Sequence, residues 1–206
     1  MPRIRMVFFY YAFLTVLIIL TLPLQICVAL LVLLTSGRPI LFVQKRIGKN
    51  GKAFLLYKYR TMKRDAQLTQ AALSRKNESD GPVFKIYNDP RFTPVGNFLS
   101  HTGLDELPQF VNVLRGEMSL IGPRPLPVAE AKKLAPWMHT RERVLPGIIS
   151  PAILTGSYHK DFRAWMRYDV EYVKQKNPQG DLLLCFAALP FMGRMFVQSV
   201  LGTGKA

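Results

Sequence analysis

Two adjacent carboxylates, Asp105 and Glu106, stand in the run LDELPQ at residues 104–109. They lie among apolar residues in a protein of formal net charge +15. Carboxylates in such surroundings must be neutralised by nearby cations or titrate at an unusual pH, and both conditions favour catalysis. The other interpretation is that they open a helix, because acidic side chains suit the first turn. The residue types alone leave both interpretations open.

A pair of cations precedes these carboxylates, in the run YKYRTM at residues 57–62. If this run is a strand, Lys58 and Arg60 point to one face and the two tyrosines to the other, because side chains alternate along a strand. Two cations on one face can hold a diphosphate. The other interpretation is a solvated polar face with no part in catalysis.

The composition favours a membrane-associated protein with an anionic partner. The 206 residues suffice for one domain with a core and an attached segment, and 49% of them are hydrophobic. With 28 basic and 13 acidic residues, the charge fits nucleic acid, anionic lipid headgroups or a phosphorylated substrate. Neither the two cysteines nor the three histidines have the spacing of a metal-ligand set.

The N-terminal segment is predicted to enter the membrane and return to the same side. Residues 7–34 carry no charge and would form a helix of about 42 Å, longer than the roughly 30 Å of bilayer hydrocarbon. Pro23 interrupts the hydrogen-bond ladder of that helix. Basic residues flank both ends, and the positive-inside tendency therefore asks for both ends in the cytoplasm. A helix-break-helix hairpin over residues 1–36 satisfies these conditions.

The remaining residues, 37–206, are predicted to form a cytoplasmic, membrane-associated domain. Its expected elements are a β-hairpin of residues 40–43 and 53–57 around Asn50-Gly51, a helix (67–73) and loop within 66–82, a helix at 128–143 and an interfacial amphipathic helix at 181–201. The last helix is not expected to span the membrane, because Arg194 lies near its middle.

Three runs closely resemble the monotopic phosphoglycosyl transferases, a family of bacterial sugar transferases. They are LDELPQ at 104–109, NVLRGEMS at 112–119 and GPRP at 122–125. Further similarities are K-x-R-T-M at 58–62, D-x-R-x-T at 89–93, PGI at 146–148 and Y-D-x-x-Y at 168–172. Enzymes of this family move a phospho-sugar from a nucleotide diphosphate sugar to a polyprenyl phosphate.

The resemblance implies a fold and a location. The fold is α+β and mainly helical: a re-entrant membrane helix-break-helix, a short β-hairpin and interfacial amphipathic helices surround a small catalytic domain. The catalytic domain would lie at the cytoplasmic face of a bacterial inner membrane, in contact with its lipids. There it would take a UDP-sugar as donor and undecaprenyl phosphate as acceptor, and so initiate glycoconjugate assembly.

The resemblance also implies roles for individual residues. Asp105 would be the nucleophile that forms a covalent phospho-sugar intermediate, and Glu106 would orient groups or accept a proton. Mg²⁺ would be bound by Asp105 and the diphosphate, since it is a hard cation that prefers oxygen ligands. The implied substrate-binding residues are Lys58, Arg60, Arg91, His101, Arg124 and Asp169.

The chain departs from the family pattern at four places. Ser100 and Gly103 stand where Arg and Ser are usual, so we expect either that His101 or Arg91 replaces a missing cation or that the donor pocket differs. Residues 149–153 replace a Thr-Gly-Leu-Ala-Gln pattern, which would alter the wall that meets the sugar or nucleotide.

The fourth departure lies in the apolar segment. Leu22 stands where a serine usually precedes the proline. Thr21 could take over the role of that serine by bonding back about one turn.

Two other function classes remain open at this point. A membrane-tethered nucleic-acid-binding protein would explain the charge but leaves the carboxylate pair without a role, so no nucleic-acid partner is expected. A scaffold with reduced catalysis would explain the departures. The sequence leaves open the sugar, the nucleobase, the polyprenol length and the oligomeric state, including a homodimer.

Overall fold

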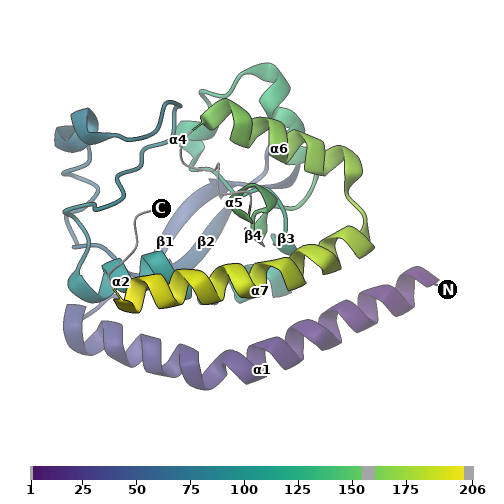
Figure 1. Cartoon of the computed structure of the whole chain (residues 1–206), viewed down its shortest axis with the longest axis horizontal. Coiled ribbons are helices and arrows are strands. Elements are labelled where there is room, and N and C mark those ends of the chain that lie inside the picture. Colours follow the sequence, from purple (N-terminus) through teal and green to yellow (C-terminus); the bar gives the residue numbers. More distant parts are fainter. Residues whose placement is uncertain (1, 155–160, 202–206) are drawn as a thin grey trace.

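The computed structural model describes residues 2–154 and 161–201, and it confirms a mainly helical α+β fold (Figure 1). The α-helices are α1 Pro2–Ser36, α2 Pro94–Thr102, α3 Phe110–Leu114, α4 Val128–Ala131, α5 Pro151–Leu154, α6 Phe162–Gln175 and α7 Pro178–Leu201. The strands are β1 Leu41–Ile47, β2 Ala53–Tyr59, β3 Ser119–Ile121 and β4 Gly147–Ile149. Short 3-10 helices are η1 Lys49–Gly51, η2 Ala71–Lys76, η3 Leu104–Gln109 and η4 Pro136–Arg143.

The long helix α1 contains Pro23, and its ribbon bends near the middle (Figure 1). Thr21 bonds back as expected: its hydroxyl donates to the carbonyl of Leu17 at 2.8 Å. The carbonyl that loses its partner to the proline is that of Ile19, four residues before Pro23, so Thr21 serves a different one. By length and composition α1 and α7 could each cross a membrane. The hairpin topology of α1 stays a prediction.

Helix α1 packs against the rest of the chain as well as exposing apolar side chains. Leu14, Val28 and Val32 are buried in two hydrophobic clusters shared with β2, α2 and α3. The Tyr59 hydroxyl, at the end of β2, donates to the carbonyl of Gln25 at 2.9 Å. The membrane segment and the domain therefore share a core, and the site is held at a defined place along α1.

Strands β1 and β2 form the predicted antiparallel hairpin. Asn50 and Gly51 both have positive φ, 55° and 72°, as the turn requires. Residues that pair across the hairpin point to the same face, and so does every second residue along each strand. Arg46 pairs with Phe54, and Phe42 pairs with Lys58. Because the two pairs are separated by four residues along each strand, Arg46 and Lys58 lie on the same face. The hairpin therefore brings two cations to one side.

The carboxylate pair lies in η3, which follows α2 after a sharp break. Thr93 caps α2 by accepting a hydrogen bond from the Gly96 amide at 2.9 Å. Gly103 ends α2 with φ 73°, a left-handed conformation that favours glycine over the serine usual at this position. Pro108 has no N–H to bond back to Leu104, which suits a short 3-10 helix. The acidic residues do open a helical turn, and this does not exclude a catalytic role.

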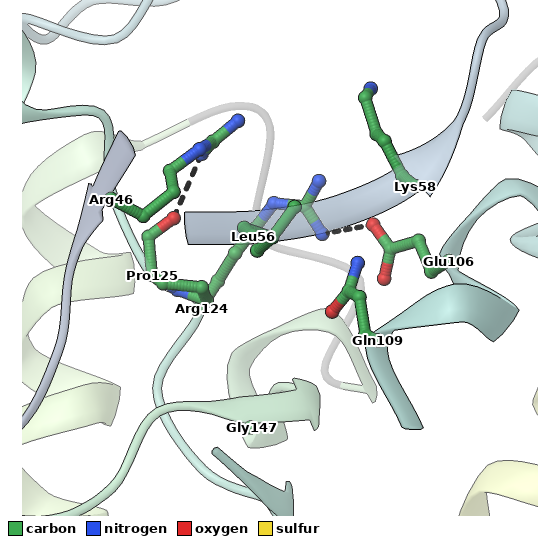
Figure 2. A pocket seen from close by; sticks show the side chains of 8 residues that line it. All are labelled: Arg46, Leu56, Lys58, Glu106, Gln109, Arg124, Pro125 and Gly147. Carbon is green, nitrogen blue, oxygen red and sulfur yellow. Dashed lines mark hydrogen bonds and ion pairs between the residues drawn. The ribbon is translucent and has the colours of Figure 1, made fainter. Parts of the chain in front are cut away.

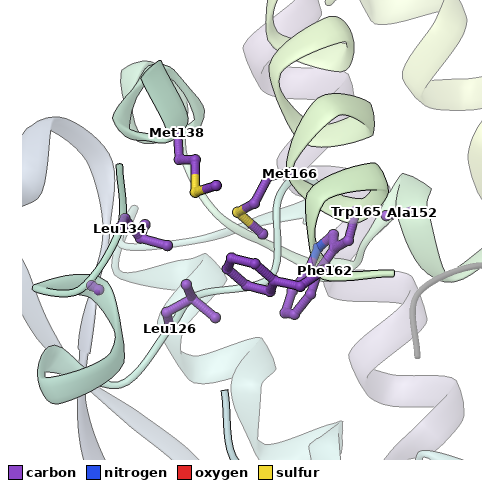
Figure 3. Packing of buried hydrophobic residues seen from close by; sticks show 8 residues of the cluster. Leu126, Leu134, Met138, Ala152, Phe162, Trp165 and Met166 are labelled. Atoms are coloured by element: carbon purple, nitrogen blue, oxygen red, sulfur yellow. The ribbon is translucent and has the colours of Figure 1, made fainter. Parts of the chain in front are cut away.

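A second layer lies on the other side of the pocket described below. Its core contains residues of α4, η4, α5 and α6 around Leu126, with Phe162 and Met166 pointing toward it (Figure 3). Strands β3 and β4 are parallel, and a Cβ at Gly147 would lie 2.1 Å from the amide of Gly122. Glycine is needed at residue 147 because the two segments approach so closely.

Two predicted helices are wrong. Residues 128–143 form α4 and the separate 3-10 helix η4, because Pro136 cannot continue a helix. Residues 67–70 form turns, and only the 3-10 helix η2 follows them. The C-terminal helix is present as α7 and exposes many large apolar side chains, among them Leu183, Phe186 and Leu189.

Candidate active site

A pocket lies between the β1–β2 hairpin, η3 and the segment 122–127 (Figure 2). Its lining residues are Arg46, Leu56, Lys58, Glu106, Gln109, Arg124, Pro125 and Gly147. Three of these residues are cations, and they come from β1, β2 and the GPRP run. A pocket with three cations beside a carboxylate pair is suited to a phosphorylated anion.

Asp105 lies beside this pocket and is almost fully buried, with 4% of its surface exposed. The Lys58 ammonium is 3.6 Å from Asp105 Oδ2. Burial raises the pKa of Asp105 to about 6, and the charge of Glu106 adds to the rise, whereas Lys58 and Arg124 oppose it. Most of the carboxyl is therefore ionised at pH 7, although its pKa lies well above the ordinary range for an aspartate. An ionised carboxylate that is weakly paired and poorly solvated is a competent nucleophile.

Glu106 faces the pocket and is paired with Arg124 (Figure 2), whose Nη1 donates to its Oε1 at 2.7 Å. The two neighbouring carboxylates therefore have different partners. Asp105 has a lysine at a long distance, and Glu106 has an arginine at hydrogen-bond distance. In a 3-10 helix successive side chains are about 120° apart, which is how adjacent residues reach cations on different elements.

The backbone of the GPRP run is held from several sides. Two backbone amides donate to it: Gly147 to the Pro123 carbonyl at 3.1 Å, and Ile47 to the carbonyl of the next residue, Leu126, at 2.9 Å. Two arginine side chains also donate: Arg141 to the Arg124 carbonyl at 2.6 Å, and Arg46 to the Pro125 carbonyl at 2.8 Å. Prolines at 123, 125 and 127 have no N–H, so the segment is fixed mainly through its carbonyls. The Arg46 bond is visible in Figure 2.

Asp169 does not face the pocket. It lies fully buried in α6 and accepts two hydrogen bonds from Arg141, from Nε at 3.0 Å and from Nη2 at 2.7 Å. Burial raises the pKa of Asp169, and the charge and hydrogen bonds of Arg141 and a hydrogen bond from Trp165 oppose this rise. A carboxylate without exposed surface cannot touch a substrate in this structure, so its position argues for an indirect role.

Three other predicted residues lie outside the pocket. Arg60 donates to the carbonyls of Ser36 and Gly37 at the end of α1. Arg91 makes a bidentate pair with Asp89. His101 bonds to the carbonyl of Asn97 and stacks edge-on against Tyr87.

The role of these three residues in substrate binding stays a prediction. The cations that line the pocket are Arg46, Lys58 and Arg124.

Sequence reasoning missed Arg46, Gln109 and Arg141. The register of the hairpin could have revealed Arg46, because counting outward from the Asn50-Gly51 turn places it on the face of Lys58. Gln109 closes the LDELPQ run and could have been inferred from helical spacing. No local signal marks Arg141, which was treated only as one of several basic residues of an expected helix.

The described residues, 2–154 and 161–201, contain no group of three or more His, Cys, Asp or Glu side chains that could hold a metal ion. His159 lies outside them. Two neighbouring carboxylates without a third protein ligand fit a cation such as Mg²⁺, which commonly uses one or two carboxylates together with substrate phosphates. The residues present therefore fit a metal that arrives with a diphosphate.

Comparison with known proteins shows which family the chain is similar to. The family model described as bacterial sugar transferase matches residues 3–194. The chain is 37% identical over 183 residues to the UDP-glucose:undecaprenyl-phosphate glucose-1-phosphate transferase of Escherichia coli, covering 84% of this chain and 36% of that protein. It is 36% identical over 170 residues to galactosyl transferase CpsE of Streptococcus agalactiae, covering 82% and 36%.

A shorter relative is similar over most of its length. The exopolysaccharide production protein ExoY of Rhizobium meliloti is 32% identical over 182 residues, which cover 85% of this chain and 80% of that protein. The chain thus spans about a third of the length of the first two relatives and most of the length of the third.

Proposed function

Because the chain belongs to the bacterial sugar transferase family, we propose that it transfers a phospho-sugar from a nucleotide diphosphate sugar to a polyprenyl phosphate. Relatives named as undecaprenyl-phosphate transferases favour undecaprenyl phosphate as acceptor and a UDP-sugar as donor. The observation that carries the proposal is the buried, weakly paired Asp105 beside a pocket with three cations. Neither a scaffold nor a nucleic-acid-binding protein needs that arrangement.

The first half of the reaction uses Asp105. One carboxylate oxygen attacks the phosphorus that carries the sugar, an acyl phosphate forms, and the bond to the nucleoside monophosphate breaks with its electron pair on the leaving phosphate. Lys58, Arg46 and Arg124 surround the diphosphate and offset the charge that develops during this step. Since Lys58 holds Asp105 at 3.6 Å, donor phosphate competes for the lysine and releases the carboxylate.

The second half regenerates the enzyme. An oxygen of the polyprenyl phosphate attacks the same phosphorus, and the acyl phosphate bond breaks to return the Asp105 carboxylate. Glu106 lines the pocket and can take a proton from the acceptor if it arrives protonated. Its pair with Arg124 keeps the arginine directed into the pocket.

Mg²⁺ would be held by Asp105 and the donor diphosphate, where it would neutralise phosphate charge. The protein's own part is the arrangement of cations and carboxylates already described. The membrane would supply the acceptor: α1 and α7 expose large apolar side chains, and we propose that they place the pocket at the cytoplasmic face of the inner membrane.

The test is release of nucleoside monophosphate before any lipid acceptor is added. Purified protein in detergent, with Mg²⁺ and candidate UDP-sugars, should release a burst limited by the amount of enzyme, and mass spectrometry should find a phospho-sugar on the peptide that holds Asp105. Asp105→Asn should remove the burst, because an amide is a poor nucleophile. Glu106→Gln should slow it.

The matched control is Asp65→Asn, which changes an exposed aspartate and should leave the burst intact. Full turnover without an adduct would reject the covalent route and leave direct transfer between the two substrates. Absence of turnover with every donor would reject the transferase itself.

A further inference from the structure

The buried pair Arg141 and Asp169 lies behind the pocket and has no role in the scheme above. Asp169 is 0% exposed and Arg141 is 5% exposed. They come from α6 and η4, and neither residue lines the pocket next to Asp105, although Arg141 lines a neighbouring pocket together with Arg124. A buried ion pair is costly to desolvate, so its presence beside a proposed active site calls for a reason.

The reason lies in a third hydrogen bond. Arg141 Nη2 donates to Asp169 at 2.7 Å and also to the backbone carbonyl of Arg124 at 2.6 Å. The same residue, Arg124, extends its side chain into the pocket and donates to Glu106. The chain of contacts runs from Asp169 through Arg141 to the backbone of Arg124, and from there along its side chain to the catalytic carboxylates.

The Arg124 backbone depends on such contacts more than most segments do. Its neighbours, Pro123 and Pro125, have no N–H, so ordinary ladder hydrogen bonds cannot fix this segment. The carbonyl of Arg124 is instead held by a charged donor, Arg141, which is itself oriented by two hydrogen bonds that it donates to Oδ2 of Asp169. Hydrogen bonds from charged donors are shorter and stronger than neutral ones, which suits a contact that determines where a side chain begins.

We propose that Arg141 and Asp169 are positioning residues that set the place of the Arg124 guanidinium in the pocket. The inference rests on the proposed function and deepens it. The proposal also gives Asp169 a role different from the phosphate-site role that the family resemblance implied. A second buried carboxylate beside the diphosphate would repel the diphosphate, which argues against direct contact. Misplacement of a catalytic group by about 1 Å can lower a rate about 100-fold, so the pair should act on kcat more than on donor KM.

The decisive variant replaces both members of the pair, Arg141→Met with Asp169→Leu. Exchange of a buried ion pair for apolar residues of similar volume is often neutral or stabilising, so this variant should fold while lacking the donor to the Arg124 carbonyl. We expect kcat to fall about 10-fold to 100-fold with donor KM changed less than about threefold. Arg143→Gln, which changes an exposed arginine, is the control and should leave both constants unchanged.

The same double replacement is then made in an Arg124→Ala background. If the pair acts through Arg124, the double replacement should lower the residual rate of the Arg124→Ala variant less than about twofold, because the effects of coupled residues are not additive. A full 10-fold loss in both backgrounds, or wild-type kcat in the folded double variant, would overturn the proposal. If the variant with both replacements does not fold, Asp169→Asn is made instead, alone and with Arg124→Ala, and the rate losses in the two backgrounds are compared in the same way.

A readout without turnover separates this inference from the proposed function. The reactivity of Arg124 toward phenylglyoxal, followed by peptide mass spectrometry with Arg143 as internal reference, should rise several-fold when the pair is replaced. Unchanged reactivity would count against positioning even in an active enzyme. If the wild-type protein transfers no phospho-sugar, yet the reactivity of Arg124 rises when the pair is replaced, the transferase is rejected and the positioning role is kept.

Discussion

Two aspartates of this protein are buried beside cations, yet they are paired very differently. Asp89 receives the Arg91 guanidinium in a bidentate pair, with Nη2 at 2.6 Å and Nε at 2.9 Å. Asp105 has the Lys58 ammonium at 3.6 Å. Burial acts to raise the pKa of both, but the hydrogen bonds and charge of Arg91 bring the pKa of Asp89 below its ordinary value, whereas the pKa of Asp105 stays at about 6.

The difference shows what separates a structural carboxylate from a reactive one. Asp89 is satisfied, and through Arg91 Nη1, which donates to the Ala66 carbonyl at 3.0 Å, it fixes the loop that follows β2. Asp105 is left partly unsatisfied, so its ionised form is held at a cost to stability. A cation that binds beside Asp105 can relieve that cost.

The largest expected effect is therefore a pair of opposite changes in stability. Asp89→Asn removes the charge that balances a buried arginine, and breaking a buried pair costs about 3–5 kcal/mol. Asp105→Asn removes a carboxylate whose pKa rises from 3.8 to about 6 with the Lys58 contact already included, and this rise corresponds to about 3 kcal/mol gained at pH 7. Thermal and denaturant unfolding in detergent should show the first variant destabilised and the second stabilised.

The dependence on pH checks the sign. The folded-state pKa of Asp105 is raised, so the native protein binds more protons than the unfolded chain, and stability falls as pH rises from about 4 to about 6. The advantage of Asp105→Asn should thus be present at pH 7 and vanish below pH 4. Asp89 behaves in the opposite sense, because its lowered pKa contributes stability that is lost as pH falls. Equal loss of stability in both variants at pH 7 would break the comparison.

The contrast between the two aspartates could be predicted from sequence only in part. The patterns around Asn50-Gly51 and LDELPQ act over a few residues, and the structure has the hairpin and the helical turn they indicate. Pro23 lies inside the single helix α1, and the re-entrant topology stays a prediction. Alternation along a strand also predicted that Lys58 lies on the face opposite to the two tyrosines, and in the structure Lys58 reaches Asp105 of η3. These are local rules, which need no knowledge of the rest of the fold.

What could not be predicted depends on contacts between distant segments. Arg60, two residues after Lys58, shares its strand face by alternation, yet β2 ends at Tyr59 and the guanidinium turns to the carbonyls at the end of α1. Asp169 meets Arg141 across 28 residues, and Arg141 meets the Arg124 carbonyl across 17. Sequence periodicity carries no information on such pairs, and the phosphate-site role of Asp169 was implied only by the family resemblance of the run at 168–172.

A second prediction uses the two neighbours of Asp105, which act on its pKa in opposite directions. Lys58 lowers the pKa and Glu106 raises it. Lys58→Met should therefore move the acidic limb of the pH dependence of kcat/KM to higher pH, and Glu106→Gln should move it to lower pH, since the reactive form of Asp105 is the ionised one. The measurement is the rate of nucleoside monophosphate release from pH 5 to 8.

The absolute rates will fall in both variants, because both residues line the pocket, so only the position of the limb is informative. Lys63→Met, which removes an exposed lysine, controls for the change in net charge and should leave the limb in place. Limbs that shift in the same direction for Lys58→Met and Glu106→Gln would show that a group other than Asp105 titrates.

The smallest expected effect completes the comparison with a pair that is neither buried nor reactive. Glu171 and Lys174 lie one turn apart on α6 with 3.6 Å between Oε2 and Nζ, and their side chains are 53% and 65% exposed. Water solvates both charges in the unfolded and folded states, so the pair should contribute only about 0.2–0.5 kcal/mol, and less in high salt. Its lysine–carboxylate distance equals that of Lys58 and Asp105, and burial is therefore what distinguishes the two pairs.

A double-mutant cycle with Glu171→Gln and Lys174→Met, measured by denaturant unfolding at low and high salt, should give a coupling free energy of about 0.2–0.5 kcal/mol. A coupling above about 1 kcal/mol would mean that distance outweighs burial in this protein, and the high pKa of Asp105 would then need a cause other than its removal from water.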